Sequence, residues 1–234
     1  MRIDVLTLFP GMFPGVLDSS IQARAATGDR VTCHVHDIRE WADNKHDKVD
    51  DRPFGGGPGM VLMCQPLWDA VHAVEKQDER PSRRILFTPQ GQPLNQALVE
   101  QLAHEERLLL IAGHYEGVDE RIVDELQPLE ISIGDYVLTG GELPAMVLID
   151  AVTRLQDGVL GHEDSAAEDS FSFRDDEMRL LDSPHYTRPR TWRDRSVPEV
   201  LLSGDHQAVA DWRLDQMKQR TRTRRPDLLE RREG

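Results

Sequence analysis

The chain has 234 residues and a formal net charge of −14 at pH 7. This length buries one substantial core and leaves room for a small second domain. No run of about eighteen apolar residues occurs, so we expect no membrane contact and a soluble, cytoplasmic protein. Taken alone, the negative charge argues against a nucleic-acid partner, because phosphate binding draws its affinity from Lys and Arg.

The N-terminal third predicts two strands followed by a long loop. Residues 2–9 and 30–37 have strand patterns, and a serine-capped helix ending at Gly28 lies between them. Residues 38–59 are polar, charged and rich in glycine. Loops this long inside a compact domain are usually functional or disordered. Cys33 lies in the second strand, far from Cys64, so we expect both thiols to be reduced and structural.

The central region repeats one design three times, in which an apolar strand runs into a glycine-containing loop. Residues 84–87 lead into TPQG, residues 108–111 lead into AGHYEG, and the run beginning at Ile133 leads through Gly140 and Gly141 into a helix that ends near Arg154. Both of these glycines can take positive φ and let a ligand approach the backbone. Strands alternating with helices, including one at residues 67–75, predict an α/β fold with a mainly parallel sheet. Ligands of such sheets bind at the carboxyl ends of the strands.

The C-terminal part differs in composition. We expect a first domain at 1–160, a flexible acidic linker at 161–185 and a small α-helical domain at 186–234, with helical patterns at 197–202 and 206–218. The stretch 188–195 carries four arginines against one aspartate, and 213–225 carries six basic residues against one aspartate. A solvated helix face is the alternative to a phosphate-binding surface here.

The glycine-rich loop carries no standard nucleotide-binding motif. The run GGGPG at 55–59 lacks a following Lys-Ser/Thr pair and does not open a helix after a strand, so it is neither a P-loop nor a dinucleotide fingerprint. A mobile hinge is one interpretation, but Asp50, Asp51 and Arg52 place charges beside a backbone that a planar ligand can approach. His46 and the aspartates suggest a metal site, although no tetrahedral ligand spacing is visible.

Five segments resemble the bacterial tRNA (guanine-N1)-methyltransferases. They occur in order at 50–60 (DDRPFGGGPGM), 113–121 (GHYEGVDER), 132–145 (SIGDYVLTGGELPA), 168–171 (EDSF) and 184–189 (PHYTRP). Further matches extend the resemblance from Leu8 to Pro226, which is nearly the whole chain. His114 departs from the family pattern, which often has Arg at this position.

The resemblance implies an α/β fold with a deep trefoil knot, of the SPOUT class, and a homodimer with active sites at the subunit interface. It implies S-adenosylmethionine as methyl donor and N1 of guanosine 37 of tRNA as acceptor. Mg²⁺ dependence is a family feature for which nothing here specifies ligands. By the same resemblance the cofactor would be bound by Thr88, Pro89, Gly113, Tyr115, Glu116, Ile133, Gly134, Asp135, Tyr136, Val137, Leu138, Gly140, Gly141 and Pro144.

Catalytic and RNA-binding residues follow from the resemblance too. Attack by guanine N1 needs a base at its proton and a cation near O6, and Asp169 and Arg154 match the family's base and electrostatic partner. Without the resemblance, Asp169 reads as a helix cap and Arg154 as a salt-bridge residue. The anticodon stem-loop of tRNA would contact His46, Asp50, Arg52, Gly59, Ser165, Arg220, Arg222 and Arg224.

Two other functions remain compatible with the residues. A non-catalytic RNA-binding module could retain the cofactor pocket as a scaffold, and it would bind the donor without transferring its methyl group. A metal-dependent phosphohydrolase could use the cluster from His46 to Asp51, and it would lose activity to chelators.

Overall fold

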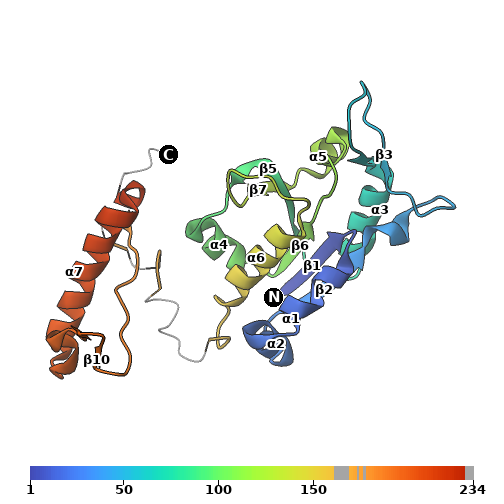
Figure 1. Cartoon of the computed structure of the whole chain (residues 1–234). Helices are drawn as coiled ribbons and strands as arrows, with labels where there is room; N and C mark the ends of the chain where they lie inside the picture. Colours follow the sequence, from blue (N-terminus) through green and yellow to red (C-terminus); the bar gives the residue numbers. More distant parts are fainter. Residues whose placement is uncertain (161–168, 173, 176–177, 230–234) are drawn as a thin grey trace. The chain divides into compact units, whose positions relative to one another are not determined.

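The computed structural model describes residues 1–160, 169–172, 174–175 and 178–229 (Figure 1). The chain divides into two compact units, Met1–Leu160 and Gly161–Gly234. A central sheet covered by helices forms the first unit, and the long helix α7 with its short neighbouring elements forms the second.

The first unit is built on a five-stranded sheet in the order β2-β1-β6-β5-β7, in which every neighbouring pair is parallel. The predicted parallel α/β class is confirmed, as are the strands predicted at 2–9, 30–37, 84–87 and 108–111 apart from their exact ends. The strands of this sheet are β1 (Arg2–Thr7), β2 (Thr32–Asp37), β5 (Arg83–Pro93), β6 (Arg107–Ile111) and β7 (Leu129–Ser132).

Helices cover both faces of this sheet. Along β6, Leu108 and Leu110 belong to one hydrophobic cluster while Leu109 and Ile111 belong to the other, because successive side chains of a strand point to opposite faces. The first cluster includes side chains of α2, α4 and α6, and the second includes those of α3 and α5. The helices of this unit are α1 (Pro14–Leu17), α2 (Ser20–Thr27), α3 (Cys64–Glu75), α4 (Gln96–Ala103), α5 (Glu120–Leu126) and α6 (Glu142–Thr153).

The stretch 38–59, expected to be a loop without pattern, contains short regular pieces. The 3-10 helix η2 (Ile38–Trp41) follows β2, as η1 (Pro10–Met12) follows β1. The short strand β3 (Asp50–Asp51) pairs antiparallel with β4 (Val61–Leu62). The glycine-rich run therefore forms the connection of a two-stranded hairpin, in which Gly55, Gly56, Gly57 and Gly59 all have positive φ.

The sequence predicted a strand beginning at Ile133, but β7 occupies the preceding residues and ends at Ser132. Gly134 has a φ of 149°, and Tyr136 N donates to Gly134 O at 2.9 Å, so the backbone turns away from the sheet at this point. The run from Ile133 to Gly140 is consequently a loop, and α6 begins after it. The expectation of a helix reaching Arg154 is confirmed, since Arg154 is the C-terminal capping residue of α6.

The second unit is organised around α7 (His206–Arg224), which begins where the Asp205 carboxylate accepts hydrogen bonds from two backbone amides of the first turn. The helix predicted at 206–218 is confirmed and extends further toward the C-terminus. The remaining elements of this unit are β8 (Arg174–Asp175), β9 (Met178–Arg179), β10 (Thr191–Trp192), β11 (Arg195–Ser196), η4 (Glu199–Leu202) and η5 (Pro226–Leu229).

The described residues between 169 and 185, expected to be part of a linker, pack within the second unit. Leu180 is buried, and Leu181 N donates to the hydroxyl of Thr221, a fully buried residue of α7. Arg220 also donates to the carbonyl of Asp182. These two hydrogen bonds attach this acidic stretch to α7. Residues 161–168, 173 and 176–177 of the expected linker lie outside the described residues.

Candidate functional site

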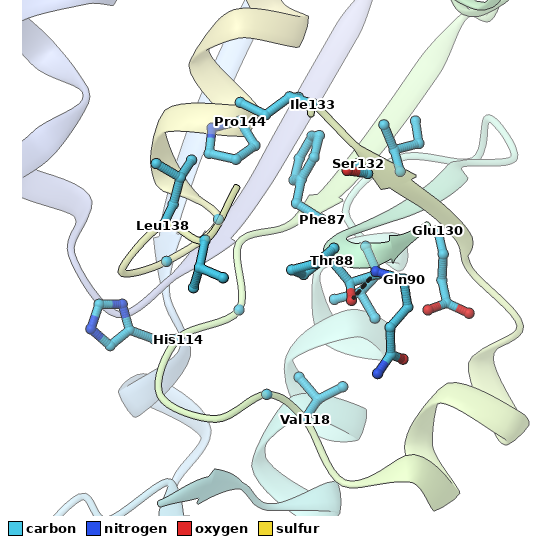
Figure 2. Close-up of a pocket in the computed structure, with 18 of the residues that line it drawn as sticks. Phe87, Thr88, Gln90, His114, Val118, Glu130, Ser132, Ile133, Leu138 and Pro144 are labelled. Atoms are coloured by element: carbon cyan, nitrogen blue, oxygen red, sulfur yellow. Dashed lines mark hydrogen bonds between the residues drawn. The ribbon is translucent and has the colours of Figure 1, made fainter. Parts of the chain in front are cut away.

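A cavity of about 440 Å³ lies in the first unit, walled by a bulge within β5 and by the loops that follow β6 and β7 (Figure 2). This is the carboxyl edge of the sheet, where α/β proteins bind their ligands. Asp135, of the predicted cofactor-binding residues, is exposed outside the cavity wall. The others all line it: Thr88, Pro89, Gly113, Tyr115, Glu116, Ile133, Gly134, Tyr136, Val137, Leu138, Gly140, Gly141 and Pro144.

A bulge in β5 forms the first wall. Phe87 and Gln92 both pair with Ile131 of β7, so the four residues between them are displaced from the ladder. Three of these four, 88–90, line the cavity, and Gln90 N donates to the Thr88 hydroxyl at 3.3 Å (Figure 2). Gly91 lies so close to β7 that a Cβ there would sit 2.5 Å from the carbonyl carbon of Glu130. The bulge therefore depends on glycine at position 91.

Direct backbone contact joins the second and third walls. Gly141 N donates to Gly113 O at 2.7 Å, and His114 forms an isolated antiparallel bridge with Gly140. A Cβ on Gly141 would lie 2.7 Å from the Cα of Ala112. The expected positive φ is wrong for this residue, whose φ is −83°, and Gly140 is not among the positive-φ glycines either. Glycine is required here because two backbone segments approach closely.

A buried polar cluster supports this junction. The Glu142 carboxylate, in the first turn of α6, is only 2% exposed and accepts a hydrogen bond from Thr7 Oγ1 at 2.8 Å. A carboxylate in this position is also favoured by the positive end of the helix dipole. The other Glu142 oxygen lies 3.7 Å from Nδ1 of His114, and the His114 ring packs against Phe9 with centroids 4.7 Å apart.

The glycine-rich hairpin lies next to the cavity, because it contacts Glu116, a residue of the cavity wall. Glu116 N donates to Met60 O at 3.0 Å, and a Cβ on Gly59 would collide with the Glu116 side chain. Burial raises the pKa of the neighbouring Tyr115. The negative charge of Asp50 and a hydrogen bond between the Tyr115 hydroxyl and Asp50 raise it further. The structure therefore brings Asp50 and Gly59 of the predicted RNA-binding set next to the cavity. His46 and Arg52 are exposed residues of the same region.

Other predicted residues lie elsewhere. Arg154 is at the opposite end of α6 from Pro144, and ten residues of helix separate them by about 15 Å. Within one chain, Arg154 is therefore outside the cavity. Asp169 belongs to the second unit, where its carbonyl accepts from Ser172 N. Ser165 lies outside the described residues, and Arg220, Arg222 and Arg224 are on α7 of the second unit.

Sequence reasoning missed much of the apolar and polar lining. Leu86 and Phe87 are the last residues of β5 before its bulge. Their position directly before TPQG could have predicted that they line the cavity. The lining residues not predicted to bind the cofactor are Leu86, Phe87, Gln90, His114, Gly117, Val118, Glu120, Val123, Glu130, Ile131, Ser132 and Thr139.

The described residues offer neither a metal-binding cluster nor a membrane-spanning helix. In the described part of the chain, no group of three or more His, Cys, Asp or Glu side chains is placed to hold a metal ion, so Mg²⁺ remains a prediction without assigned ligands. The helices within the described ranges are all too short or too polar to cross a membrane.

A parallel α/β sheet with a glycine-lined cavity at its carboxyl edge defines a protein that binds a small molecule at its strand ends. The family model for tRNA (Guanine-1)-methyltransferase TrmD matches residues 1–231. The chain belongs to this family, and it is therefore a methyltransferase of the SPOUT class. The trefoil knot implied by this class stays a prediction.

Curated relatives agree with this assignment. A protein of Moorella thermoacetica named tRNA (guanine-N(1)-)-methyltransferase is 57% identical over 233 residues, covering 99% of this chain and 91% of the relative. A protein of Anoxybacillus flavithermus with the same name is 56% identical over 230 residues, covering 98% of this chain and 92% of the relative. The similarity thus includes both units of the chain.

Proposed function

We propose that the protein transfers a methyl group from S-adenosylmethionine to N1 of guanosine 37 of tRNA. The observation that carries this proposal is the cavity at the carboxyl edge of the sheet, whose walls are the bulge of β5 and the glycine-containing loops after β6 and β7. In a chain of this methyltransferase family, a cavity with this lining is the natural place for the methyl donor.

The lining fits such a donor in size and chemistry. A volume of about 440 Å³ is within the range of roughly 300–1,000 Å³ found for small-molecule sites. Phe87, Leu138 and Pro144 offer apolar surface for an adenine ring, while Gln90 and Glu130 offer polar groups for a ribose or amino acid (Figure 2). When bound, S-adenosylmethionine supplies an electrophilic methyl group on a sulfonium centre.

The chain's own residues supply the acid–base chemistry. In this proposal Asp169 accepts the proton of guanine N1, and Arg154 stabilises the negative charge that develops on O6. An aspartate has an ordinary pKa of only about 3.9, so it is a weak base toward N1. Stabilisation of the O6 anion is therefore as important as the base, which gives a guanidinium its role.

A homodimer follows from the position of Arg154. Because α6 holds Arg154 about 15 Å from Pro144, a guanidinium acting at the cavity has to come from a second copy of the chain. Exposed apolar side chains offer a surface for that copy. Phe9 and Leu143 follow Thr7 and Glu142 closely in the chain, and the side chains of Thr7 and Glu142 are in contact. The segment after β1 and helix α6 expose three more apolar side chains: Met12, Val16 and Val147.

RNA contacts complete the proposal. The hairpin carrying His46, Asp50, Arg52 and Gly59 would face the anticodon stem-loop, and the arginines 220, 222 and 224 would contact phosphates. The basic stretches 188–195 and 213–225 within an otherwise acidic chain suit RNA binding despite the net charge of −14. Asp135 and Ser165 keep the roles that the family resemblance implies, as does Mg²⁺, and the reaction would take place in the cytoplasm.

The decisive experiment is to incubate the protein with tRNA and labelled S-adenosylmethionine and map the modified nucleotide by mass spectrometry. We expect one methyl group on N1 of guanosine 37. Asp169→Ala should abolish transfer and leave donor affinity nearly unchanged, while the exposed control Asp215→Ala should be active. Donor binding without transfer by the wild-type protein would instead support a non-catalytic RNA-binding module.

A further inference from the structure

A second cavity, of about 510 Å³, lies wholly within the second unit. It is formed by the segment 184–190, the 3-10 helix η4 and the N-terminal half of α7. Partly buried Val197, Leu201 and Val209 give it an apolar floor. Tyr186, Arg188 and Arg213 are exposed residues of its wall. An apolar floor with charged and aromatic walls is the composition of a ligand site.

The charge of this cavity is positive in an acidic protein. Arg190, a third arginine of the wall, pairs with Glu199 at 3.0 Å. The guanidinium groups of Arg188 and Arg213 make no hydrogen bond or ion pair to any of the described residues. Two uncompensated guanidinium groups lining one cavity favour an anion, and a guanidinium matches the geometry of a phosphate.

Aromatic side chains accompany these arginines. The Tyr186 ring lies 6.3 Å from that of Trp212, which fixes it beside α7. On the hairpin of β10 and β11, which follows the segment directly, Trp192 is 59% exposed and the Arg193 guanidinium lies 4.8 Å from the centre of its ring. Exposed rings interleaved with arginines are typical of surfaces on which unpaired bases stack.

We propose that this cavity binds one unpaired nucleotide of the RNA substrate, with its phosphate between Arg188 and Arg213 and its base against Tyr186. This inference rests on the proposed function, because it concerns the same RNA. The proposed function assigns the methylated guanosine to the cavity of the first unit, so the nucleotide bound here would be a different one. An acidic peptide would satisfy the arginines but would make no use of the aromatic wall.

Fluorescence anisotropy with a short fluorescein-labelled single-stranded RNA tests the phosphate contacts. The double variant Arg188→Gln/Arg213→Gln should weaken binding about tenfold or more and reduce the salt slope of log K by about 0.7, the contribution of one single-strand phosphate contact. The matched control Arg24→Gln/Arg83→Gln removes the same charge from exposed positions of the first unit and should change the slope little. If the two double variants weaken binding equally, the loss of affinity comes from the change in net charge alone, and the proposal is overturned.

The base contact is tested with variants of Tyr186. Tyr186→Phe keeps the ring and should bind RNA as wild type does, whereas Tyr186→Leu should lose about tenfold in affinity. Equal affinity of the two would mean that the cavity holds only an anion, which contradicts a nucleotide site.

Methyl transfer separates this inference from the proposed function. If the wild-type protein methylates tRNA and Arg188→Gln/Arg213→Gln leaves both the RNA dissociation constant and KM unchanged, the inference fails alone. If wild-type protein binds the short RNA through these residues but methylates no tRNA, the proposed function fails alone.

Discussion

Thr7 and Glu142 are 135 positions apart in the chain, yet the Thr7 hydroxyl donates to the Glu142 carboxylate at 2.8 Å in a buried environment. The same hydroxyl accepts a hydrogen bond from Phe9 N at 2.9 Å. This threonine thereby connects the end of β1 to the first turn of α6, next to the Gly140 and Gly141 backbone that walls the cavity of the first unit. The geometry of the cavity thus depends on a side chain that does not line it.

Thr7→Val should destabilise the protein by about 1–3 kcal/mol, because it leaves a buried carboxylate and a backbone amide short of a partner. Thr153→Val is the matched control. Thr153 is fully buried in α6, and its hydroxyl has no hydrogen-bond partner within the described residues. Its replacement should be neutral or stabilising by up to about 1 kcal/mol. Urea unfolding of both variants measures the difference, and equal losses would deny Thr7 its connecting role.

At the opposite edge of the sheet, Asp4 and Arg107 form a fully buried ion pair at 3.0 Å. The Arg107 guanidinium also donates to carbonyls at the end of α3, including Val74 O and Glu75 O. Arg107→Met should therefore cost about 1–3 kcal/mol in unfolding free energy for each buried carbonyl that it leaves without a donor. The Asp4 carboxylate would lose one hydrogen bond but keep those from Arg2. The measurement is urea unfolding at neutral pH, with exposed Arg83→Met as control.

The same pair predicts an acid dependence of stability. Burial alone would raise the pKa of Asp4, but hydrogen bonds from His36, Arg2 and Arg107 and the charge of Arg2 outweigh it and hold the pKa far below its ordinary value. The stability from the ionised carboxylate is therefore fully present above about pH 4, the unfolded pKa, and decreases as the pH falls further. The difference in unfolding free energy between wild type and Asp4→Asn should shrink below pH 4. A constant difference down to pH 3 would contradict this.

Gly141→Ala should disturb the cavity of the first unit, because its methyl group would meet the backbone of Ala112 at 2.7 Å and backbone cannot rotate away. We expect a loss of about 1–3 kcal/mol in stability, the usual cost of overpacking, together with weaker binding of S-adenosylmethionine by calorimetry. At neighbouring Gly113 the nearest atom to an added Cβ is 3.7 Å away, an ordinary contact. Gly113→Ala should therefore unfold at the wild-type urea concentration, and similar midpoints for the two variants would argue against the close approach.

These glycines show where sequence reasoning reaches its limit. The order of strands and loops follows from local pattern, so the cavity's position at the strand ends was predictable. The sequence showed only that Gly141 can take positive φ, whereas glycine is needed there because the backbone of Ala112, just after β6, comes close, which only the folded chain provides. Glu130 and Gln90 line the cavity because Phe87 and Gln92 pair with one residue of β7. No pattern of neighbouring residues in the sequence predicts such a bulge. None predicts either that Glu142 accepts a hydrogen bond from Thr7, which is 135 positions away.

Both cysteines should be unreactive in the folded protein. Burial, followed by the charge of Asp4, raises the pKa of Cys33 to about 12. At pH 8 only about one thiol in ten thousand is then ionised, and the thiolate is the reactive form. Burial also raises the pKa of Cys64, as do the hydrogen bond that its thiol donates to the Asp119 carboxylate and the charge of that carboxylate. Labelling with a disulfide reagent at pH 8 should be slow until denaturant is added, and rapid labelling of Cys33 in the native protein would refute the prediction.

If Arg154 acts on the cavity of a partner subunit, two inactive variants should restore activity when they are mixed. Arg154→Ala lacks the guanidinium, and Gly113→Phe fills the cavity with a ring placed beside Leu86 and Val118. Random exchange of subunits makes half of the dimers mixed, each with one intact site, so about one quarter of wild-type activity should return.

A mixture of Arg154→Ala with Asp169→Ala distinguishes how the two proposed catalytic residues are shared. If one subunit supplies both residues to the partner's cavity, every site in the mixed dimer lacks one of them and no activity returns. Recovery to about one quarter would mean that the base and the guanidinium come from different subunits. If no pair of variants complements, including Gly113→Phe with Arg154→Ala, then Arg154 acts within its own chain or not at all. Since α6 holds Arg154 about 15 Å from Pro144, that outcome would remove it from the reaction.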